Sequence, residues 1–168
     1  CNPVHERLLA AAIEQAFPEI FISNSHQIAN VPREYERAQA TVANALVQPI
    51  MHRYLGRLQS ARPKITINVM SSSGGLMDIH QARSFPCRTL LSGPAGGVVG
   101  AWSVGSRLTQ NALLSLDMGG TSTDVAAGKD LPTCVEQGRL GAHPIAQEML
   151  PVETVGAGGG SIAWIDPD

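Results

Sequence analysis

Apolar and polar positions along the chain repeat with periods that predict helices and strands in turn. Asn2 and Pro3 make a plausible helix start, and apolar positions at helical spacing predict an amphipathic helix that ends before Pro18. The longest helical pattern covers residues 32–60, and Pro49 inside it predicts a kink or a break. The apolar positions of this pattern share one face: Ala38, Val42, Ala45, Leu46, Ile50, Tyr54 and Leu58.

Short apolar runs bounded by turn residues predict strands. The most regular run covers residues 64–70, where Ile65, Ile67 and Val69 alternate with other positions. We expect this strand to share one sheet with strands at 87–92 and 112–118, the last of them buried, and we expect the long helix to cover a face of that sheet. The other expected strands lie at 19–25, in a hairpin over 123–138 with its turn near 128–130, and on both sides of the glycine loop in 152–166.

Turn and capping residues locate the remaining elements. Residues 71–75 are a loop, and Asp78 is a good N-cap for a short helix that reaches Phe85. Pro94 suits the first turn of a further helix whose many glycines suggest close approach to a neighbour or a ligand. The order of elements predicts an α/β domain with a mixed sheet.

Composition and charge narrow the class of protein. A chain of 168 residues provides one ordinary domain or two small lobes, and 43% hydrophobic residues fit a soluble globular class. The net charge of −2 and the scattered arginines argue against a nucleic-acid partner. No run approaches the ~20 apolar residues of a membrane span. Cys1, Cys87 and Cys134 show no CxxC spacing and predict reduced thiols in a cytoplasmic protein.

In the stretch Leu113 to Gly128, an apolar run is followed by more polar and glycine residues than a simple turn needs. Asp117 and Asp124 flank two glycines and three hydroxyl residues. Glycine lets backbone N–H groups approach phosphate oxygens, hydroxyls add donors, and a carboxylate at a strand end can hold Mg²⁺ through its waters. The pattern therefore fits a magnesium–nucleotide phosphate cradle. A β-hairpin whose Gly-Gly turn and capping aspartate are purely structural explains it equally well.

Two further segments are rich in glycine. Ser92 to Ala101 enters a helix, whose N-terminus offers free N–H groups to anions, although tight packing by small residues is the simpler explanation of this segment alone. Val155 to Ser161 contains three consecutive glycines, and ordering them costs chain entropy that a plain connection does not require. An unimportant flexible loop remains the alternative for that segment.

Other nucleotide and catalytic motifs are missing from the sequence. It contains no GxGxxG dinucleotide fingerprint, no GxxxxGK[ST] phosphate loop and no GxSxG nucleophile elbow. The five histidines form no HxxxH pair. Three glycine-rich segments without a phosphate-loop lysine are what the function has to explain.

Three segments, in this order and spacing, resemble the hydantoinase A / 5-oxoprolinase family: RTLLSGPAGGVVGA, DMGGTSTDVA and TVGAGGGSIAW. Arg33 to Leu55 and the segment SSSGGLM also resemble it, so the resemblance covers nearly the whole chain. The family includes ATP-dependent N-methylhydantoinases and an acetone carboxylase subunit of similar sequence.

The resemblance implies an α/β fold of the actin-like ATPase (ribonuclease H-like) type, a lobe with a mixed sheet and flanking helices. Two related lobes of that fold clamp Mg-ATP, and DMGGTSTD would belong to the second. Residues 1–30 would be the tail of the amino-terminal hydantoinase/oxoprolinase region. Residues 31–168 would be the first, incomplete part of the actin-like domain, with the adenosine site beyond them. We therefore expect a central fragment that is inactive by itself.

The residue pattern and the resemblance together imply roles for a set of side chains and loops. Asp117 would be catalytic, orienting Mg²⁺ or the attacking group, and Asp124 would take part in the metal site, either by binding the metal's waters or by supporting the direct ligands. The residues expected to bind the nucleotide phosphates are Gly119, Gly120, Thr121, Ser122, Thr123, Gly93, Gly96, Gly97, Gly158, Gly159 and Gly160.

The implied activity is the ATP-dependent hydrolysis of a cyclic amide such as a lactam or a hydantoin. Phosphorylation of the carbonyl oxygen would create a good leaving group and let water attack a poor electrophile. The implied partners are the small cyclic amide, the missing lobe of the same chain and a second, hydantoinase B-like subunit. The alternatives are a non-catalytic actin-like scaffold or regulatory subunit, an acetone carboxylase-type ATP-binding subunit, and a kinase of the same superfamily.

The sequence departs from the family pattern in two places. Ser73 stands where the resemblance leads us to expect an asparagine, within a glutamine-serine-asparagine-glycine-glycine series. Pro151 and Glu153 stand where relatives often carry Asp and His before the glycine loop. These changes bear on the substrate rather than on the family.

Overall fold

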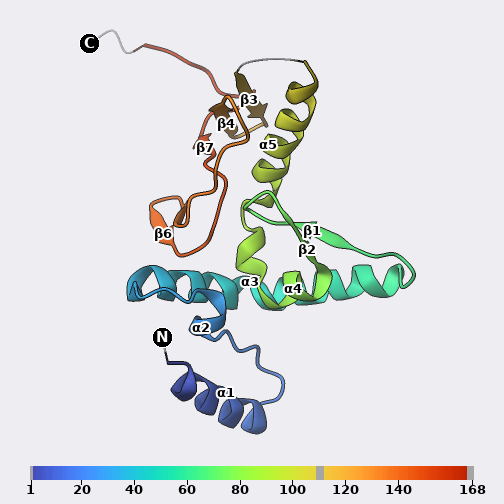
Figure 1. The fold of residues 1–168 in the computed structure, drawn as a ribbon, viewed down its shortest axis with the longest axis vertical. Coiled ribbons are helices and arrows are strands. Elements are labelled where there is room, and N and C mark those ends of the chain that lie inside the picture. The colour runs from blue at the N-terminus through green and yellow to red at the C-terminus, as the bar shows by residue number, and fades with distance from the viewer. Residues whose placement is uncertain (1, 109–111, 166–168) are drawn as a thin grey trace.

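The computed structural model describes residues 2–108 and 112–165 (Figure 1). The elements in chain order are α1 Val4–Ala16, α2 Ser25–Ile28, α3 Glu34–Ala61, β1 Asn68–Met70, β2 Leu76–Asp78, α4 Ile79–Ser84, the 3₁₀ helix η1 Pro86–Thr89, α5 Ser92–Gly105, the 3₁₀ helix η2 Ser106–Leu108, β3 Leu113–Met118, β4 Thr123–Gly128, β5 Gly138–Leu140, β6 His143–Ile145 and β7 Glu153–Val155.

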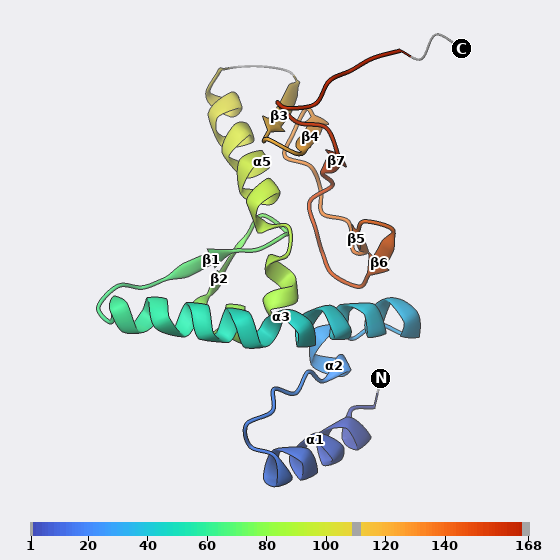
Figure 2. The same cartoon turned by 180° about the vertical axis from the view of Figure 1, so that it is seen from behind.

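The long helix α3 lies across the molecule, and α5 runs away from it toward the sheet formed by β3, β4 and β7 (Figure 1). Helix α1 lies on the opposite side of α3, as the view from behind also shows (Figure 2). The described strands form three antiparallel sheets, β1–β2, β3–β4–β7 and β5–β6. The expected combination of helices and strands is confirmed. The expected mixed sheet is wrong for the described part of the chain, where every strand pair is antiparallel.

Local caps fix the helix starts that the sequence predicts. Asn2 Oδ1 accepts the Val4 N–H at 3.1 Å at the start of α1. The Asp78 carboxylate accepts the N–H groups of His80 and Gln81 at the start of α4. These contacts join neighbouring residues, so the sequence alone was enough to place them.

The apolar face predicted for α3 is not its buried face. The helix runs unbroken through Pro49, and its buried positions are Ala40, Asn44 and Leu55. The apolar positions that the sequence pattern aligns are exposed, with Leu46 at 70%. Elements α2, α4, η1 and β6 pack against the other side of α3. Of the strands that α3 was expected to cover, it packs against β1 and β2 through Leu55, whereas β3 belongs to a separate sheet.

A buried asparagine holds α3 to its neighbours. The Asn44 side-chain amide donates to Ser23 Oγ at 2.9 Å and to the Ser84 carbonyl at 3.2 Å. Its oxygen accepts the Cys87 N–H at 3.2 Å. All the polar atoms of this side chain are thus paired although it is fully buried, which explains how a polar residue defines the inward face of α3.

Three predicted strands are absent. Residues 19–20 lie in a turn and residues 21–24 have no strand partner; the Phe21 ring lies 5.0 Å from the His52 ring of α3, and the chain then enters α2. Residues 87–92 form η1 and the start of α5, because Pro86 begins a 3₁₀ turn that the Thr89 hydroxyl closes. Residues 161–165 pair with no described strand, and Asp166 lies outside the described residues.

The single predicted sheet is also wrong. Val69 packs in a cluster with Leu55, Met77, Ile79 and Ala82, whereas Leu116 lies on an exposed face of the sheet formed by β3, β4 and β7. The strand expected at 112–118 forms as β3. It was expected to be buried, but three of its apolar side chains are exposed: Leu114, Leu116 and Met118. A short apolar run does not specify which strand it pairs with, and here β1 and β3 each pair with the next strand along the chain.

The predicted hairpin over 123–138 does not form among the described residues, and its first strand, β4, instead makes a hairpin with the preceding strand, β3. Strand β4 pairs with β3 around the turn at 119–122, and its other edge pairs with β7. The expected turn at 128–130 joins no strand pair among the described residues, and Val135 instead forms an isolated bridge with Met149. This shift places both aspartates of the glycine motif on paired strands.

Candidate functional site

Two carboxylates face each other across the β3–β4 hairpin. Asp117 and Asp124 are register partners, and Thr154 of β7 is the partner of Asp124 on its other side. Cross-strand partners point to the same face of a sheet. The Thr154 hydroxyl donates to Asp124 Oδ1 at 2.5 Å, while the Asp117 carboxylate has no hydrogen bond or ion pair within the described residues. One carboxylate of the row is therefore held and the other is available.

Helix α5 covers this face of the sheet. A cluster of buried residues joins the two elements: Ala95, Val98 and Trp102 of α5 with Ala126 of β4 and Leu150. A Cβ atom built on Gly97 would lie 3.8 Å from Asp117 Oδ2, which places this carboxylate against the helix surface. Gly96 and Gly97 lie inside α5, where backbone N–H groups are used by the helix, whereas Gly93 lies in its first turn.

The second glycine loop is seated on the hairpin turn. The Gly159 N–H donates to the Gly119 carbonyl at 2.9 Å, and the Thr123 hydroxyl donates to the Ala157 carbonyl at 2.6 Å. A Cβ atom on Gly158 would lie 2.5 Å from the Gly120 carbonyl carbon, so only glycine allows this contact. Two segments that the sequence singled out separately thus form one structure beside Asp117 and Asp124.

The contacts divide the predicted phosphate donors into two groups. The N–H groups of Gly119, Gly158 and Gly159 are already bonded within the two loops, and the Thr123 hydroxyl is bonded and buried. These residues shape the loops rather than offer donors. Among the described residues, four predicted positions of the two loops carry N–H groups without a partner: Gly120, Thr121, Ser122 and Gly160.

The chemistry of the carboxylate pair fits a hydrated divalent cation. Mg²⁺ is typically held by one or two carboxylates together with substrate phosphates and waters. Like charges directly opposite each other destabilise a strand pair, and a shared cation removes that cost. No group of three or more His, Cys, Asp or Glu side chains among the described residues is arranged to hold a metal, so Asp117 and Asp124 would be the protein's share of such a site.

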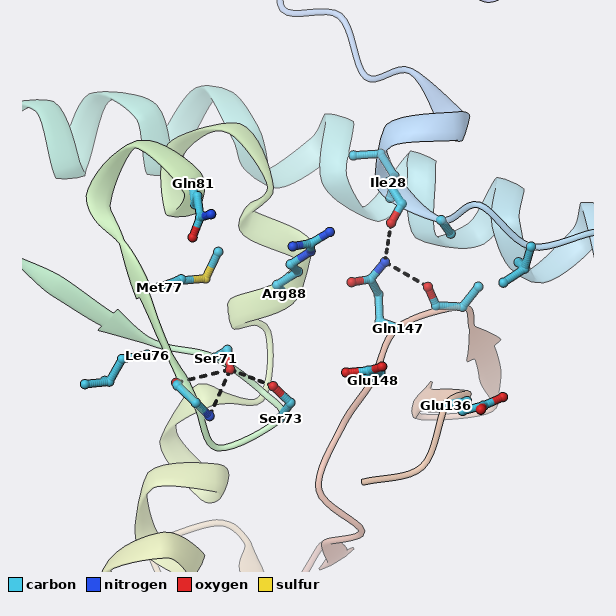
Figure 3. Close-up of a pocket in the computed structure, with 14 residues that line it drawn as sticks. Ile28, Ser71, Ser73, Leu76, Met77, Gln81, Arg88, Glu136, Gln147 and Glu148 are labelled. Atoms are coloured by element: carbon cyan, nitrogen blue, oxygen red, sulfur yellow. Dashed lines mark hydrogen bonds between the residues drawn. The ribbon is translucent and has the colours of Figure 1, made fainter. Parts of the chain in front are cut away.

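A separate cleft of about 720 Å³ lies between the β1–β2 hairpin with its serine loop and the segment around Gln147 (Figure 3). Ser71 and Ser73 line one wall, with their hydroxyl oxygens 2.8 Å apart. Arg88 and Gln81 line the cleft from η1 and α4. The predicted loop at 71–75 is thereby confirmed, and it also forms a wall of this cleft.

Sequence reasoning missed the polar residues of this cleft. Arg88 begins the segment RTLLSGPAGGVVGA but was given no role there, and Gln147 and Glu148 belong to no motif; the fold alone brings the three together. The neighbouring Cys87 adds no nucleophile, because burial raises the pKa of its thiol to about 11. Cys87 and Cys134 are both free thiols in the structure, and Cys1 lies outside the described residues.

Comparison with known families finds one match that contains all three glycine segments. The profile of the family described as Hydantoinase/oxoprolinase matches residues 37–168. The chain belongs to this family. The match contains the hairpin, the second glycine loop, α5 and most of the cleft.

Individual members of the family are similar over nearly the whole chain. Caprolactamase subunit alpha from Pseudomonas jessenii is 32% identical over 98% of the chain, and 5-oxoprolinase from Saccharomyces cerevisiae is 35% identical over 96%. The crystal structure of the ATP-dependent caprolactamase from Pseudomonas jessenii matches 99% of the chain with a TM-score of 0.83 and 31% identity. A nucleotide-free acetone carboxylase structure matches 99% with a TM-score of 0.80 and 27% identity.

These relatives are much longer than the chain. It spans 24% of caprolactamase subunit alpha and 13% of the yeast 5-oxoprolinase. It spans 25% of the caprolactamase chain in the crystal structure and 24% of the acetone carboxylase chain. None of the described helices has the length and apolar character needed to cross a membrane.

Proposed function

We propose that the chain is part of an ATP-dependent enzyme that activates the carbonyl of a cyclic amide by phosphorylation. The observation that supports this most strongly is the contact of the 119–122 turn with the 156–161 loop beside Asp117 and Asp124. Phosphoryl transfer needs donors from several directions and negative groups that hold a metal. The described loops gather both at one end of a sheet.

Each residue type in this arrangement has a part in the proposal. The N–H groups of Gly120, Thr121, Ser122 and Gly160 would bind phosphate oxygens, and the loop contacts of Gly158 would hold these donors in place. Asp117 would be the free carboxylate that orients the metal or the attacking group. Bound Mg²⁺ would neutralise charge on the transferred phosphoryl oxygens.

The proposed reaction uses one ATP for each ring opened. The amide oxygen takes the γ-phosphoryl group and ADP leaves. Water adds to the activated carbon, the C–N bond breaks as the ring nitrogen takes a proton, and a second water hydrolyses the acyl phosphate that remains. The protein's share of the catalysis would be positioning and charge stabilisation rather than covalent chemistry.

We assign residues 31–168 to an actin-like ATPase lobe and residues 1–30 to a preceding region, with the rest of the nucleotide site in the remainder of a longer protein. The name of the caprolactamase relative, subunit alpha, supports a partner subunit. The free thiols of Cys87 and Cys134 support a cytoplasmic protein.

A second candidate function is that of an acetone carboxylase-type ATP-binding subunit. The fold similarity to acetone carboxylase, with a TM-score of 0.80, favours it. The phosphate loops would act in the same way, with a ketone in place of the cyclic amide.

The test is ATP consumption by the full-length protein, expressed with and without a candidate partner subunit. We expect ADP release to depend on 5-oxoproline, hydantoin or ε-caprolactam. Dependence on acetone and bicarbonate instead would favour the second candidate. Tight partner binding without turnover of any of these compounds would favour the non-catalytic scaffold or regulatory subunit.

A further inference from the structure

The cleft shown in Figure 3 contains a donor and an acceptor that are oriented but unpaired. Gln147 is 7% exposed, and its Nε2 donates to the carbonyls of Ile28 at 3.0 Å and Ala146 at 2.8 Å. Because both neighbours are acceptors, the amide orientation is fixed and Oε1 is left as an acceptor. Figure 3 shows this oxygen directed into the cleft, and no described donor is bonded to it.

Arg88 supplies the matching donors. Its guanidinium lies 5.0 Å from the centre of the Phe85 ring, and no described carboxylate forms an ion pair with it. Arg88 and Gln147 both project into the cleft in Figure 3. A cation with five N–H donors that is positioned by an aromatic ring is suited to an uncharged or negative acceptor oxygen.

A cyclic amide matches this pair of groups. In a small ring the amide is held cis, so its C=O and N–H lie side by side and can meet a donor and an acceptor at once. Open-chain secondary amides are almost always trans and point these groups in opposite directions. The buried Met77 and the side chain of Ile28 add apolar wall for ring carbons, and the volume of about 720 Å³ lies within the usual range for small-molecule sites.

Helix α5 lies near both the serine loop of the cleft and Asp117. Met70, which precedes the serine loop of the cleft, has its Cγ 3.8 Å from the position of a Cβ on Gly96. Asp117 Oδ2 lies at the same distance from the position of a Cβ on Gly97. Consecutive residues of α5 thus lie next to the residue that precedes the serine loop and next to the free carboxylate.

We propose that this cleft binds the ring of the cyclic amide, with Arg88 donating to the amide oxygen and Gln147 Oε1 accepting the amide N–H. The assignment rests on the proposed function and adds the substrate site to it. It predicts selectivity for cis amides that carry an N–H.

The test uses the full-length protein and the cyclic amide that stimulates its ATPase most among 5-oxoproline, hydantoin and ε-caprolactam. Arg88→Met keeps chain length and removes the donors, and Gln147→Leu removes the acceptor. We expect each substitution to raise the KM for the amide by about tenfold or more, because a hydrogen bond to a fixed partner is lost. The KM for ATP should stay within about twofold of the wild-type value. Gln48→Leu, a glutamine bonded to the Ser84 carbonyl away from the cleft, is the matched control and should change neither.

A substrate analogue checks the acceptor separately. N-methyl-ε-caprolactam has no N–H, so Gln147→Leu should weaken its binding far less than it weakens binding of ε-caprolactam. If Gln147→Leu does not fold, Arg88→Met decides, because Arg88 is exposed and its loss leaves the core intact. An unchanged KM for the amide in Arg88→Met would overturn the cleft assignment and leave amide-dependent ATPase, and so the proposed function, standing.

Calorimetric titration of the three amides without ATP tests the cleft even if the proposed function fails. If no amide stimulates the wild-type ATPase, the proposed function fails, and binding alone decides the cleft. Amide binding to the wild type that Arg88→Met weakens by about tenfold would retain the cleft as an amide site. Absence of binding to the wild type would overturn it.

Discussion

Asp117 is the residue on which the phosphate-site proposal depends most. Asparagine keeps its size and hydrogen-bonding capacity but removes the charge, so a purely structural cap would tolerate Asp117→Asn. A residue that orients metal or water would not, and its loss typically reduces the rate by ~10²-fold or more. We expect a large fall in the ATPase rate of the full-length enzyme with an unchanged melting temperature. Asp130→Asn is the control, and a near-normal rate for Asp117→Asn would leave only the structural hairpin.

Gly158 tests whether the contact between the two loops matters. A Cβ atom there would lie 2.6 Å from both the Gly119 carbonyl oxygen and the Thr121 nitrogen, so Gly158→Ala must push the loops apart. We expect it to raise the KM for ATP and lower the ATPase rate of the full-length protein by about tenfold or more, as for other misplaced catalytic groups. Gly156→Ala is a matched control in the same loop, because a Cβ there meets no atom within 4 Å. Equal activity of the two variants would contradict a role for the contact.

At the scale of elements, α1 is held to α2 by one carboxylate. Glu6 accepts the Ser25 hydroxyl at 2.5 Å and the His26 N–H at 3.1 Å, and its Oε2 lies 2.8 Å from His26 Nδ1. The Ser25 and His26 hydrogen bonds lower the pKa of Glu6 from 4.5 to about 2. The depressed pKa means that the contact stabilises the fold above pH ~4.5 and loses this stabilisation as the pH falls toward 2.

This gives a prediction for α1 and α2. Hydrogen-exchange protection of their amides in the full-length protein, corrected for intrinsic rates, should decrease between pH 4.5 and pH 2.5. In Glu6→Gln, which cannot titrate, protection should be lower at pH 5 and should lose most of this pH dependence. A wild-type profile that matches the Glu6→Gln profile would show that the carboxylate does not hold α1.

At the scale of the whole molecule, large apolar surfaces are uncovered. One is the α3 face containing Leu46, Ile50 and Tyr54, and another is the sheet face containing Leu114 and Leu116. Surfaces of this extent are typically covered by other parts of a protein or by partners. The chain also spans only about a quarter of the caprolactamase relative.

We therefore predict that residues 1–168 alone do not turn over ATP. Purified 1–168 should bind a hydrophobic dye more strongly than the full-length protein and should release no ADP above background with any of the three amides. Leu46→Glu in 1–168 should reduce dye binding, because it places a charge on the exposed α3 face. Measurable amide-dependent turnover by 1–168 would contradict the need for the remainder of the protein.

The sequence by itself determined the local features of this protein. Asp78 and Asn2 mark helix starts because caps join residues close in the chain, and the glycine motifs stand out because glycine is required where backbones approach. The family followed from the order and spacing of these motifs. The caps and glycine motifs depend on residues that are close in the chain, and the family depends on the order of the motifs. None of these features depends on how the rest of the chain packs.

Only the tertiary structure decided which faces and segments meet. The apolar stripe of α3 reads as a core face, yet burial fell on the opposite side, where Asn44 finds three polar partners from distant segments. The pairing of Asp117 with Asp124 depends on strand register, and the meeting of Arg88 with Gln147 depends on the packing of segments 59 positions apart. Long-range contacts of this kind leave no periodic signal in a single sequence, because their geometry is set by the whole packed fold.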